Sequence, residues 1–521
     1  MEDKSNMSET IKEHSWIPLI LVCFATFIIA LDTTFMNVSI SSVVADLNTD
    51  VSTIQTISSF YTLITASFML LSTKLQDIVG KKKLFLIGAV IYGVGTLTAA
   101  LSSSVLMLFV GWALLEGLGG ALMTPTAVSI ISGTYHGDKR TLALAIESAL
   151  VAIAAAIGPL FGGVVTTYFT WRLGFAVEFI IVLVVLALSG KIPYFEATGS
   201  KSELDITGAI VSFVGLVLFV IGILMLTDDT TFSIAAMVAG LIVLAVFALF
   251  EIKRKRKGNV PLLDVELLKD RNLRVGTILR LMVNLAMGGT LFAVSVYLQS
   301  VLALSAFNTG LTLLPMTLGL LLFALAAPKL SAKLNHKILM SVGCIISIIG
   351  CLILSQQFTM DTTMLELMPG LFILGAGLGF VMALGVDIAL SNIPEEGQNN
   401  ASGIVTTGQT LGQSMGTAII GVILILGVIG GISDAVDTYV PEHSGDQTFE
   451  HGVYDYFQSI GSINEVNAEN STVQNVVNVI IKDSMQFVMY VTAALMAIIF
   501  VLTFRLTDKE IKKPDKKFKK P

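Results

Sequence analysis

Charged residues are scarce in this 521-residue sequence: Asp, Glu, Lys and Arg make up 13% of it, whereas hydrophobic residues make up 54%. A soluble globular chain carries about 25% charged residues. This composition, with a mean hydropathy of +0.82, argues against a water-soluble globular protein and is typical of the membrane class. The net charge of −6 gives no indication of nucleic-acid binding.

Cysteine and histidine are rare, and neither is placed for a disulfide or a metal site. The three cysteines fall within long apolar runs, where we expect small apolar packing residues: Cys23, Cys344 and Cys351. The five histidines fall in predicted tails or loops: His14, His136, His336, His443 and His451. We therefore predict no metal site, and if protons cross the membrane on side chains, carboxylates must carry them.

The motifs of nucleotide-driven and hydrolytic chemistry are missing. The sequence contains no G-x-x-x-x-G-K-[ST] phosphate loop, no H-E-x-x-H pair and no Cys/His cluster. No segment is long enough for a sizeable soluble domain. These absences argue against an ATP-driven pump within this chain and against an enzyme, and they predict no cofactor. Transport would draw on an ion gradient or on the gradient of the substrate itself.

Long apolar runs are abundant and recur along the whole chain. Each has roughly 20 residues, enough to cross about 30 Å of hydrocarbon as a helix, and is too continuous for a strand of a membrane barrel. We predict an all-α membrane protein with fourteen transmembrane helices. The expected spans are 16–37, 53–73, 84–103, 105–126, 142–166, 172–190, 206–226, 232–252, 275–297, 308–328, 338–356, 366–390, 403–430 and 484–504.

Basic residues are sorted to one side of the predicted membrane. With the N-terminus inside, 29 of the 32 Lys and Arg residues fall in cytoplasmic segments, and Arg172, Arg280 and Lys482 do not. The positive-inside rule therefore predicts that both termini are cytoplasmic. The segment 431–481 has eight acidic residues and no Lys or Arg, which suits an external loop. Whether that loop forms a cap or is poorly ordered stays open.

The two ends of the chain resemble each other. A shift of 255 residues places Lys74 and Gly88 on Lys329 and Gly343, and similar shifts align two further glycine-rich stretches. Parallel repeats of this kind are a transporter architecture, with the substrate site between the halves near the midplane. The predicted organisation is a cytoplasmic tail (1–15), a six-helix bundle (16–190), a linker with two inserted helices (191–260), a second six-helix bundle with an external acidic loop at 431–482 (261–505) and a basic cytoplasmic tail (506–521).

Ionisable residues within the predicted helices are few, and each is a functional candidate because its insertion costs roughly 2.5–3.5 kcal/mol. They are Asp32, Glu116, Glu147, Glu178, Arg280 and Asp387. We predict that Asp32, Glu116 and Glu147 couple protons. All six, with Asn37 and Gln413, are expected at the substrate cavity. Alternatives stay open: Asp32, Glu178 and Asp387 as interfacial residues, Glu116 and Glu147 as neutral structural acids, and Arg280 as a counter-charge to one acid.

Two further polar features suit moving parts. The loop 73–83 places Asp77 among lysines, in a turn that Gly80 permits, and an acid at a helix edge pairs with basic groups or a helix N-terminus. Such a contact is able to break and reform as the halves rock. A stripe in the thirteenth span consists of Thr406, Thr410, Gln413 and Thr417. It either lines a cavity or holds helices together.

Five motifs in the same order resemble the major facilitator superfamily, specifically the fourteen-helix drug:proton antiporter family of the EmrB/QacA type. They are LDTTFMNVSIS (31–41), TKLQDIVGKK (73–82), IGPLFGG (157–163), YLQSVLALSAFNTGLTLLP (297–315) and PEEGQNNASGIVTTGQTLGQSMG (394–416). The resemblance implies conformational gating by a set of eight residues: Asp77, Gly80, Lys81, Lys82, Gly158, Pro159, Gly162 and Gly163.

One stretch departs from the family pattern. Where the family has R-x-x-Q-G in its fourth helix, this chain has ALLEG, so that Ala113 replaces the Arg and Glu116 the Gln. In the family that Arg is thought to assist proton transfer. We expect Glu116 to exchange protons in its place, with Asp32 and Glu147 as collaborators.

The resemblance implies proton-coupled antiport that exports amphipathic or cationic small molecules by alternating access. Two other functions stay open: a proton-coupled transporter of one metabolite or metal cation, and, more remotely, a membrane sensor on a transporter scaffold. The expected partners are a small-molecule substrate, protons and the lipid bilayer, without nucleic acid. We expect a monomer in the cell membrane.

Overall fold

The computed structural model describes residues 15–197, 205–226, 229–259, 261–331, 334–393, 398–459 and 471–506. Within these ranges the chain forms helices and no strands, as the composition predicts. The first half contains α2 (Ile17–Phe35), η1 (Met36–Val38), α3 (Ile40–Leu47), α4 (Val51–Val79), α5 (Lys81–Ala100), α6 (Val105–Leu108), the π-helical η2 (Phe109–Glu116), α7 (Gly117–Thr134), α8 (Gly137–Tyr168), α9 (Arg172–Ala187) and η3 (Ser189–Lys191).

The second half follows a pair of inserted helices, α10 (Ile206–Leu224) and α11 (Thr230–Arg256). It contains η5 (Val265–Lys269), α12 (Arg271–Val296), η6 (Tyr297–Val301), α13 (Ala306–Ser331), α14 (His336–Leu354), α15 (Met364–Leu390), α16 (Gln398–Tyr439), η8 (Pro441–His443), α17 (Gln447–Ser459) and α18 (Ser471–Thr503).

A helix occupies every span that the sequence predicts, although not all of them meet the length of a membrane crossing. Twelve described helices are long and apolar enough to cross a membrane, and the bent α4 makes thirteen if its two parts count as one span. The two parts of α4 meet at an angle of 50°. At the remaining predicted position, α9 has 16 residues, fewer than the roughly 20 that span a bilayer upright.

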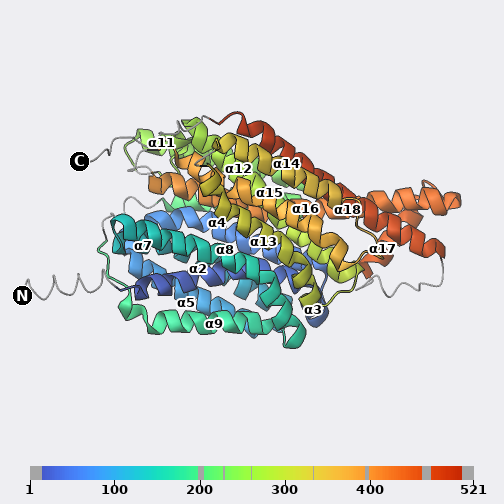
Figure 1. The fold of residues 1–521 in the computed structure, drawn as a ribbon, viewed down its shortest axis with the longest axis horizontal. Coiled ribbons are helices and arrows are strands. Elements are labelled where there is room, and N and C mark those ends of the chain that lie inside the picture. The colour runs from blue at the N-terminus through green and yellow to red at the C-terminus, as the bar shows by residue number, and fades with distance from the viewer. Residues whose placement is uncertain are drawn as a thin grey trace, which may run out of the picture.

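The helices form two bundles side by side (Figure 1). In the first, α2 packs on α8, and α5 packs on α7 and α9; in the second, α12 packs on α16, and α15 lies between α13 and α14. The bundles meet where α8 contacts α13 and where α4 contacts α16. The inserted α10 packs against both α4 and α16, so that it covers one edge of this junction.

Burial separates central helices from peripheral ones. In the most apolar window of α12, 83% of the residues are buried, whereas in α11 only 22% are. The exposed side chains of α11 are large and apolar, including Leu241, Ile242 and Leu249. Because such a surface is stable only against lipid, α11 lies at the lipid-facing edge and α12 lies at the centre.

The segment predicted as an external loop at 431–482 is partly helical. The helix α16 continues to Tyr439, α17 forms within the segment, and α18 begins at Ser471. A small apolar cluster that includes Ile432, Val436 and Ile480 joins α16 to α18. Acidic residues between the apolar ones conceal this extension from a hydropathy analysis. Residues 460–470 lie outside the described ranges.

Close helix packing positions the π-helical segment η2 against α5. A Cβ atom on Gly95 would lie 2.7 Å from the backbone nitrogen of Glu116, and one on Gly111 would lie 2.6 Å from that of Ala99. Real Cβ atoms do not approach other atoms so closely, so α5 and η2 approach at a distance that only glycine permits.

Replacing Gly95 by alanine is therefore expected to separate α5 from η2 and to destabilise the protein. Overpacking of this kind costs about 1–3 kcal/mol. The measurement is the thermal midpoint of the purified protein in detergent, with Gly190→Ala as the matched control, since a Cβ there would meet nothing within 4 Å. Equal midpoints for the two variants would contradict the packing described here.

Candidate functional site

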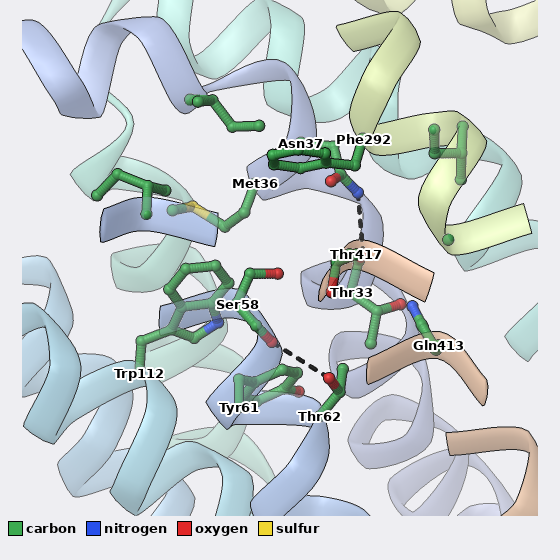
Figure 2. A pocket seen from close by; sticks show the side chains of 14 residues that line it. Thr33, Met36, Asn37, Ser58, Tyr61, Thr62, Trp112, Phe292, Gln413 and Thr417 are labelled. Carbon is green, nitrogen blue, oxygen red and sulfur yellow. Dashed lines mark hydrogen bonds between the residues drawn. The ribbon is translucent and has the colours of Figure 1, made fainter. Parts of the chain in front are cut away.

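A small cavity lies between the two bundles (Figure 2). Its volume of about 20 Å³ is room for about one water molecule, far below the roughly 300–1,000 Å³ of a drug-sized pocket. A larger substrate can enter only if the bundles part. The cavity is lined by Thr33, Met36, Asn37, Ile40, Ile54, Ser58, Tyr61, Thr62, Trp112, Gly288, Leu291, Phe292, Gln413 and Thr417.

The cavity lining combines apolar side chains with hydroxyl and amide groups. Of the residues that the sequence assigns to it, Asn37 and Gln413 line it. Thr417 lines the cavity and also lies 3.0 Å from the Ser59 hydroxyl across the junction. At this end of the polar stripe of α16, Gln413 lines the cavity and Thr417 serves both of the roles that the sequence left open.

Three carboxyl groups meet behind this cavity, inside the first bundle. Asp32 of α2, Glu116 of η2 and Glu178 of α9 each offer an oxygen, and these oxygens lie within 4.8 Å of one another. All three side chains are 0% exposed. Like charges this close cannot all remain ionised in a dry site, so the cluster must take up protons or another cation.

The cluster has few hydrogen-bond donors. The Trp112 indole donates to Asp32 Oδ2 at 3.0 Å, and the Tyr92 hydroxyl donates to Glu178 Oε2 at 3.0 Å. In the part of the chain that the structure describes, no group meets hydrogen-bond geometry with the other oxygens of Asp32 and Glu178 or with either oxygen of Glu116, and the Tyr61 side chain lies beside Asp32. Among the described side chains, no Lys, Arg or His forms an ion pair with the three acids.

Glycines bring the surrounding tyrosines close to Glu116. A Cβ on Gly117 would lie 2.9 Å from the Tyr61 carbonyl oxygen, and one on Gly119 would lie 2.6 Å from the Tyr92 backbone nitrogen. The acid itself ends the π-helical segment η2. Such segments occur frequently at functional sites. The glycine-rich sequence after Glu116 thus lets α4 and α5 close around the acid.

An aromatic pair separates the cluster from the cavity. Tyr61 and Trp112 both line the cavity, and their rings stack with centroids 5.8 Å apart and planes inclined by 26°. Trp112 also binds Asp32. One side chain therefore contacts the cavity with its ring and the carboxyl cluster with its N–H group.

The other predicted ionisable residues lie elsewhere. Glu147 of α8 lies beside Thr26 of α2 and is not a member of the cluster. Arg280 of α12 donates to Gln409 Oε1 at 2.6 and 3.1 Å and to the Met382 carbonyl at 2.6 Å.

Arg280 does not line the cavity, and the alternative that it is a counter-charge to one acid finds no support among its described contacts. Its partners are neutral acceptors, and no described carboxylate pairs with it. Amide and carbonyl oxygens accept the hydrogen bonds of a guanidinium group although they carry no negative charge. The side chain of Asp387 lies outside the described residues, as does any contact that it makes.

The loop between α4 and α5 has the turn that the sequence requires. Gly80 has φ 92°, a conformation that favours glycine. Lys82 donates to the Ile192 carbonyl at 2.7 Å, and the Lys81 ammonium lies 5.4 Å from the centre of the Phe195 ring. Asp77, in the same loop, is also engaged with a neighbouring group and is not free. The segment after α9 thus holds the lysines of this loop.

The glycine–proline motif of α8 faces both bundles. Cβ atoms on Gly158 and Gly162 would collide with Thr34 and Phe35 of α2, so these glycines pack within the first bundle. On another face of α8, Gly163 packs against Ala306 of α13, and the Pro159 carbonyl packs against Gly310. The motif therefore connects the helix that carries Asp32 to the second bundle.

Hydrogen bonds also join the bundles at the end where α3 lies. Gln299 of η6 accepts from the Ser41 backbone at 3.0 Å and donates to the Asn37 carbonyl at 3.0 Å. Gln55 of α4 donates to the Thr417 carbonyl at 2.9 Å. Gln299 thus binds the chain segment that follows Asp32.

Comparison with known proteins identifies this architecture. Residues 22–417 match the family described as the Major Facilitator Superfamily. The chain belongs to this superfamily. It is accordingly a multi-pass cell-membrane protein of a transporter family and not an enzyme.

Relatives and solved structures agree with this assignment. A probable actinorhodin transporter of Streptomyces coelicolor is 28% identical over 81% of this chain and 74% of its own length. The multidrug efflux pump LfrA of Mycolicibacterium smegmatis is 26% identical over 79% of this chain and 81% of its own. An auto-inhibited peptide transporter of the POT family shares the fold, with a TM-score of 0.61, 16% identity and coverage of 94% and 98%.

Several residues of the site were not predicted from the sequence. Three of them, Tyr61, Tyr92 and Trp112, are aromatic residues in apolar helices, where nothing distinguishes them from packing residues. The side of the cavity that α4 forms did have a signal in the sequence, because polar residues recur there at helical spacing: Gln55, Ser58 or Ser59, and Thr62. Gln299 carried no comparable signal.

The Gln299 contacts generate a test of the junction. Gln299→Leu removes two hydrogen bonds between the bundles, each worth about 1 kcal/mol, so opening at the α3 end should become roughly thirtyfold more favourable. Cysteines introduced at Ser41 and Ser300 report opening through their labelling rate in a cysteine-free background.

Gln356→Leu is the control, because Gln356 bonds to Ser355 within its own bundle. Labelling that increases equally in both variants would show that the Gln299 bonds do not hold this end closed.

Proposed function

We propose that this protein exports amphipathic or cationic small molecules by proton-coupled antiport, with fourteen spans and both termini cytoplasmic. The carboxyl cluster, one aromatic layer from a cavity between the two bundles, is the observation that carries this proposal. Relatives described as an antibiotic transporter and a multidrug efflux pump support the direction of transport and the substrate class.

Trp112 and Tyr61 are the proposed link between protons and substrate. A charged Asp32 accepts a strong, charge-assisted hydrogen bond from Trp112. Protonation of Asp32 weakens that bond and frees the indole, which forms part of the cavity wall. A substrate that displaces Trp112 acts in the reverse direction and favours proton release. The bundles then part at one end or the other in alternating access.

The motif on α8 extends this link to the junction. Because Gly158 and Gly162 fit closely against α2 while Gly163 fits against α13, a shift of α2 changes the surface that α8 presents to the second bundle. The proposed gating elements lie in the loop between α4 and α5, at the end of α4 away from α3. They are Asp77, Gly80, Lys81 and Lys82.

A proton gradient supplies sufficient energy for this work. One charge that moves through 100 mV provides about 2.3 kcal/mol, and each tenfold accumulation of substrate requires about 1.4 kcal/mol. One uncompensated proton thus sustains a substrate gradient of roughly 40- to 50-fold.

Glu116→Gln tests the coupling directly. The variant keeps the shape of the side chain but cannot release a proton, so proton-driven flux in proteoliposomes under an imposed pH gradient should fall by more than about tenfold. Unchanged proton-coupled flux would contradict the assignment of Glu116.

Glu147→Gln is the matched comparison, since it removes a buried acid outside the cluster. We expect a smaller loss of flux than in Glu116→Gln. An equal loss would restore Glu147 to the coupling role that the sequence indicated, and the structure would then require a second proton site on α8.

The substrate class is tested in cells. Expression in an efflux-deficient bacterium should raise resistance to several lipophilic cations and antibiotics, and a proton uncoupler should abolish the difference. Resistance that persists in the uncoupler, or flux of a single metabolite only, would replace this proposal with a gradient-driven or metabolite-specific transporter.

A further inference from the structure

The carboxyl cluster contains more buried oxygens without hydrogen-bond partners than proton binding alone requires. Five buried oxygens have no partner within hydrogen-bond geometry among the described residues, although the Tyr61 hydroxyl lies beside Asp32: Asp32 Oδ1, Glu116 Oε1, Glu116 Oε2, Glu178 Oε1 and Tyr61 Oη. Four of them belong to the carboxyl groups. The fifth is a hydroxyl on a side chain that is 2% exposed and that faces all three acids. An unsatisfied buried oxygen typically costs about 1–3 kcal/mol, so this arrangement requires a ligand.

The spacing of the three carboxyl groups fits one cation. Oxygens that share a Ca²⁺ ion lie 2.3–2.6 Å from it, and therefore no more than about 5 Å from one another. The three carboxyl groups satisfy this limit at 4.8 Å. Glu116 has two unpartnered oxygens and is able to bind in the bidentate manner that Ca²⁺ favours.

The chemistry of the site restricts the ion. Its donors are all oxygens, which suit hard cations rather than Zn²⁺ or Cu²⁺. Mg²⁺ retains several water molecules when bound, and the three acids are 0% exposed, so a hydrated ion does not fit. Two positive charges offset three carboxylates better than one positive charge does.

We propose that Asp32, Glu116, Glu178 and Tyr61 form a binding site for a Ca²⁺-sized divalent cation, which enters in exchange for two protons. Two protons leave the carboxyl groups as one divalent ion binds, so the net charge of the site is unchanged. The site lies one aromatic layer from the cavity, and the proposal goes beyond the proton coupling described above.

Within the described ranges, every titratable group that faces the site belongs to the first bundle. These groups are Asp32 of α2, Tyr61 of α4, Tyr92 of α5, Glu116 of η2 and Glu178 of α9. Three of the five are acids, and none is a base. Because protons compete with the ion for the same carboxyl oxygens, cation affinity should rise as the pH rises.

Calorimetry on the purified full-length protein tests the proposal. Ca²⁺ is titrated at pH 6.5 and pH 8 in buffers of different ionisation enthalpy, so that the number of released protons is measured. We expect one saturable site, tighter at the higher pH, with about two protons released and with weaker binding of Mg²⁺ and Na⁺.

Variants locate the site. Glu178→Gln should weaken Ca²⁺ binding by more than about tenfold, since even outer-shell partners of a metal contribute about 10–100-fold; Tyr61→Phe should weaken it less, and Glu147→Gln should not change it. Thermal midpoints in the absence of Ca²⁺ confirm that each variant is folded.

Two results would overturn the proposal. One is the absence of saturable Ca²⁺ binding at either pH. The other is binding that survives in both Glu178→Gln and Glu116→Gln, which would place the ion elsewhere, for example on the acidic segment 431–481. Proton-driven flux measured with Ca²⁺ removed by a chelator tests the proposed antiport separately, so each idea can fail without the other.

Discussion

Three carboxyl groups that share a dry space inside one bundle are the constraint around which this structure is arranged. Asp32, Glu116 and Glu178 come from three separate helices, and their mutual repulsion opposes folding unless positive charge enters the site. Among the described residues the groups around the acids are neutral: Trp112 and Tyr92 donate to Asp32 and Glu178, and the Tyr61 hydroxyl lies beside Asp32. The remaining compensation must therefore come from protons or a bound cation, and on the proposed mechanism the exchange of that charge couples a gradient to movement.

Small residues make this arrangement mechanically sensitive. Glycines at 95, 111, 117 and 119 leave no free space between η2, α7 and the helices α4 and α5. A close-packed interior transmits displacement instead of absorbing it. On the proposed mechanism, a change in the size or charge of the cluster is therefore passed to the Tyr61–Trp112 pair and, through the α8 motif, to the junction with the second bundle.

Much of the fold was predictable because each apolar run is a local property of the chain. The same is true of Gly80, whose positive φ follows from a tight turn between two helices. The membership of the cluster was not predictable, since it depends on the rotation of α2, η2 and α9 about their axes. The sequence favoured Glu147 as the partner of Asp32 and Glu116, yet among the described residues it is Glu178 that meets them. Arg280 likewise finds an amide, which no sequence rule distinguishes from a carboxylate partner.

The separation of the cluster from the cavity has a consequence for specificity. In the described arrangement the cavity lining contains hydroxyl, amide and apolar groups but none of the three acids. On the proposed mechanism the cargo therefore need not touch the coupling groups, and it acts on them only by moving the Tyr61–Trp112 wall. A wall responds to the volume of a ligand more than to its functional groups. One coupling site is thus able to serve substrates of different chemistry, whereas a transporter whose acids bind the cargo directly is restricted to cargo of matching charge.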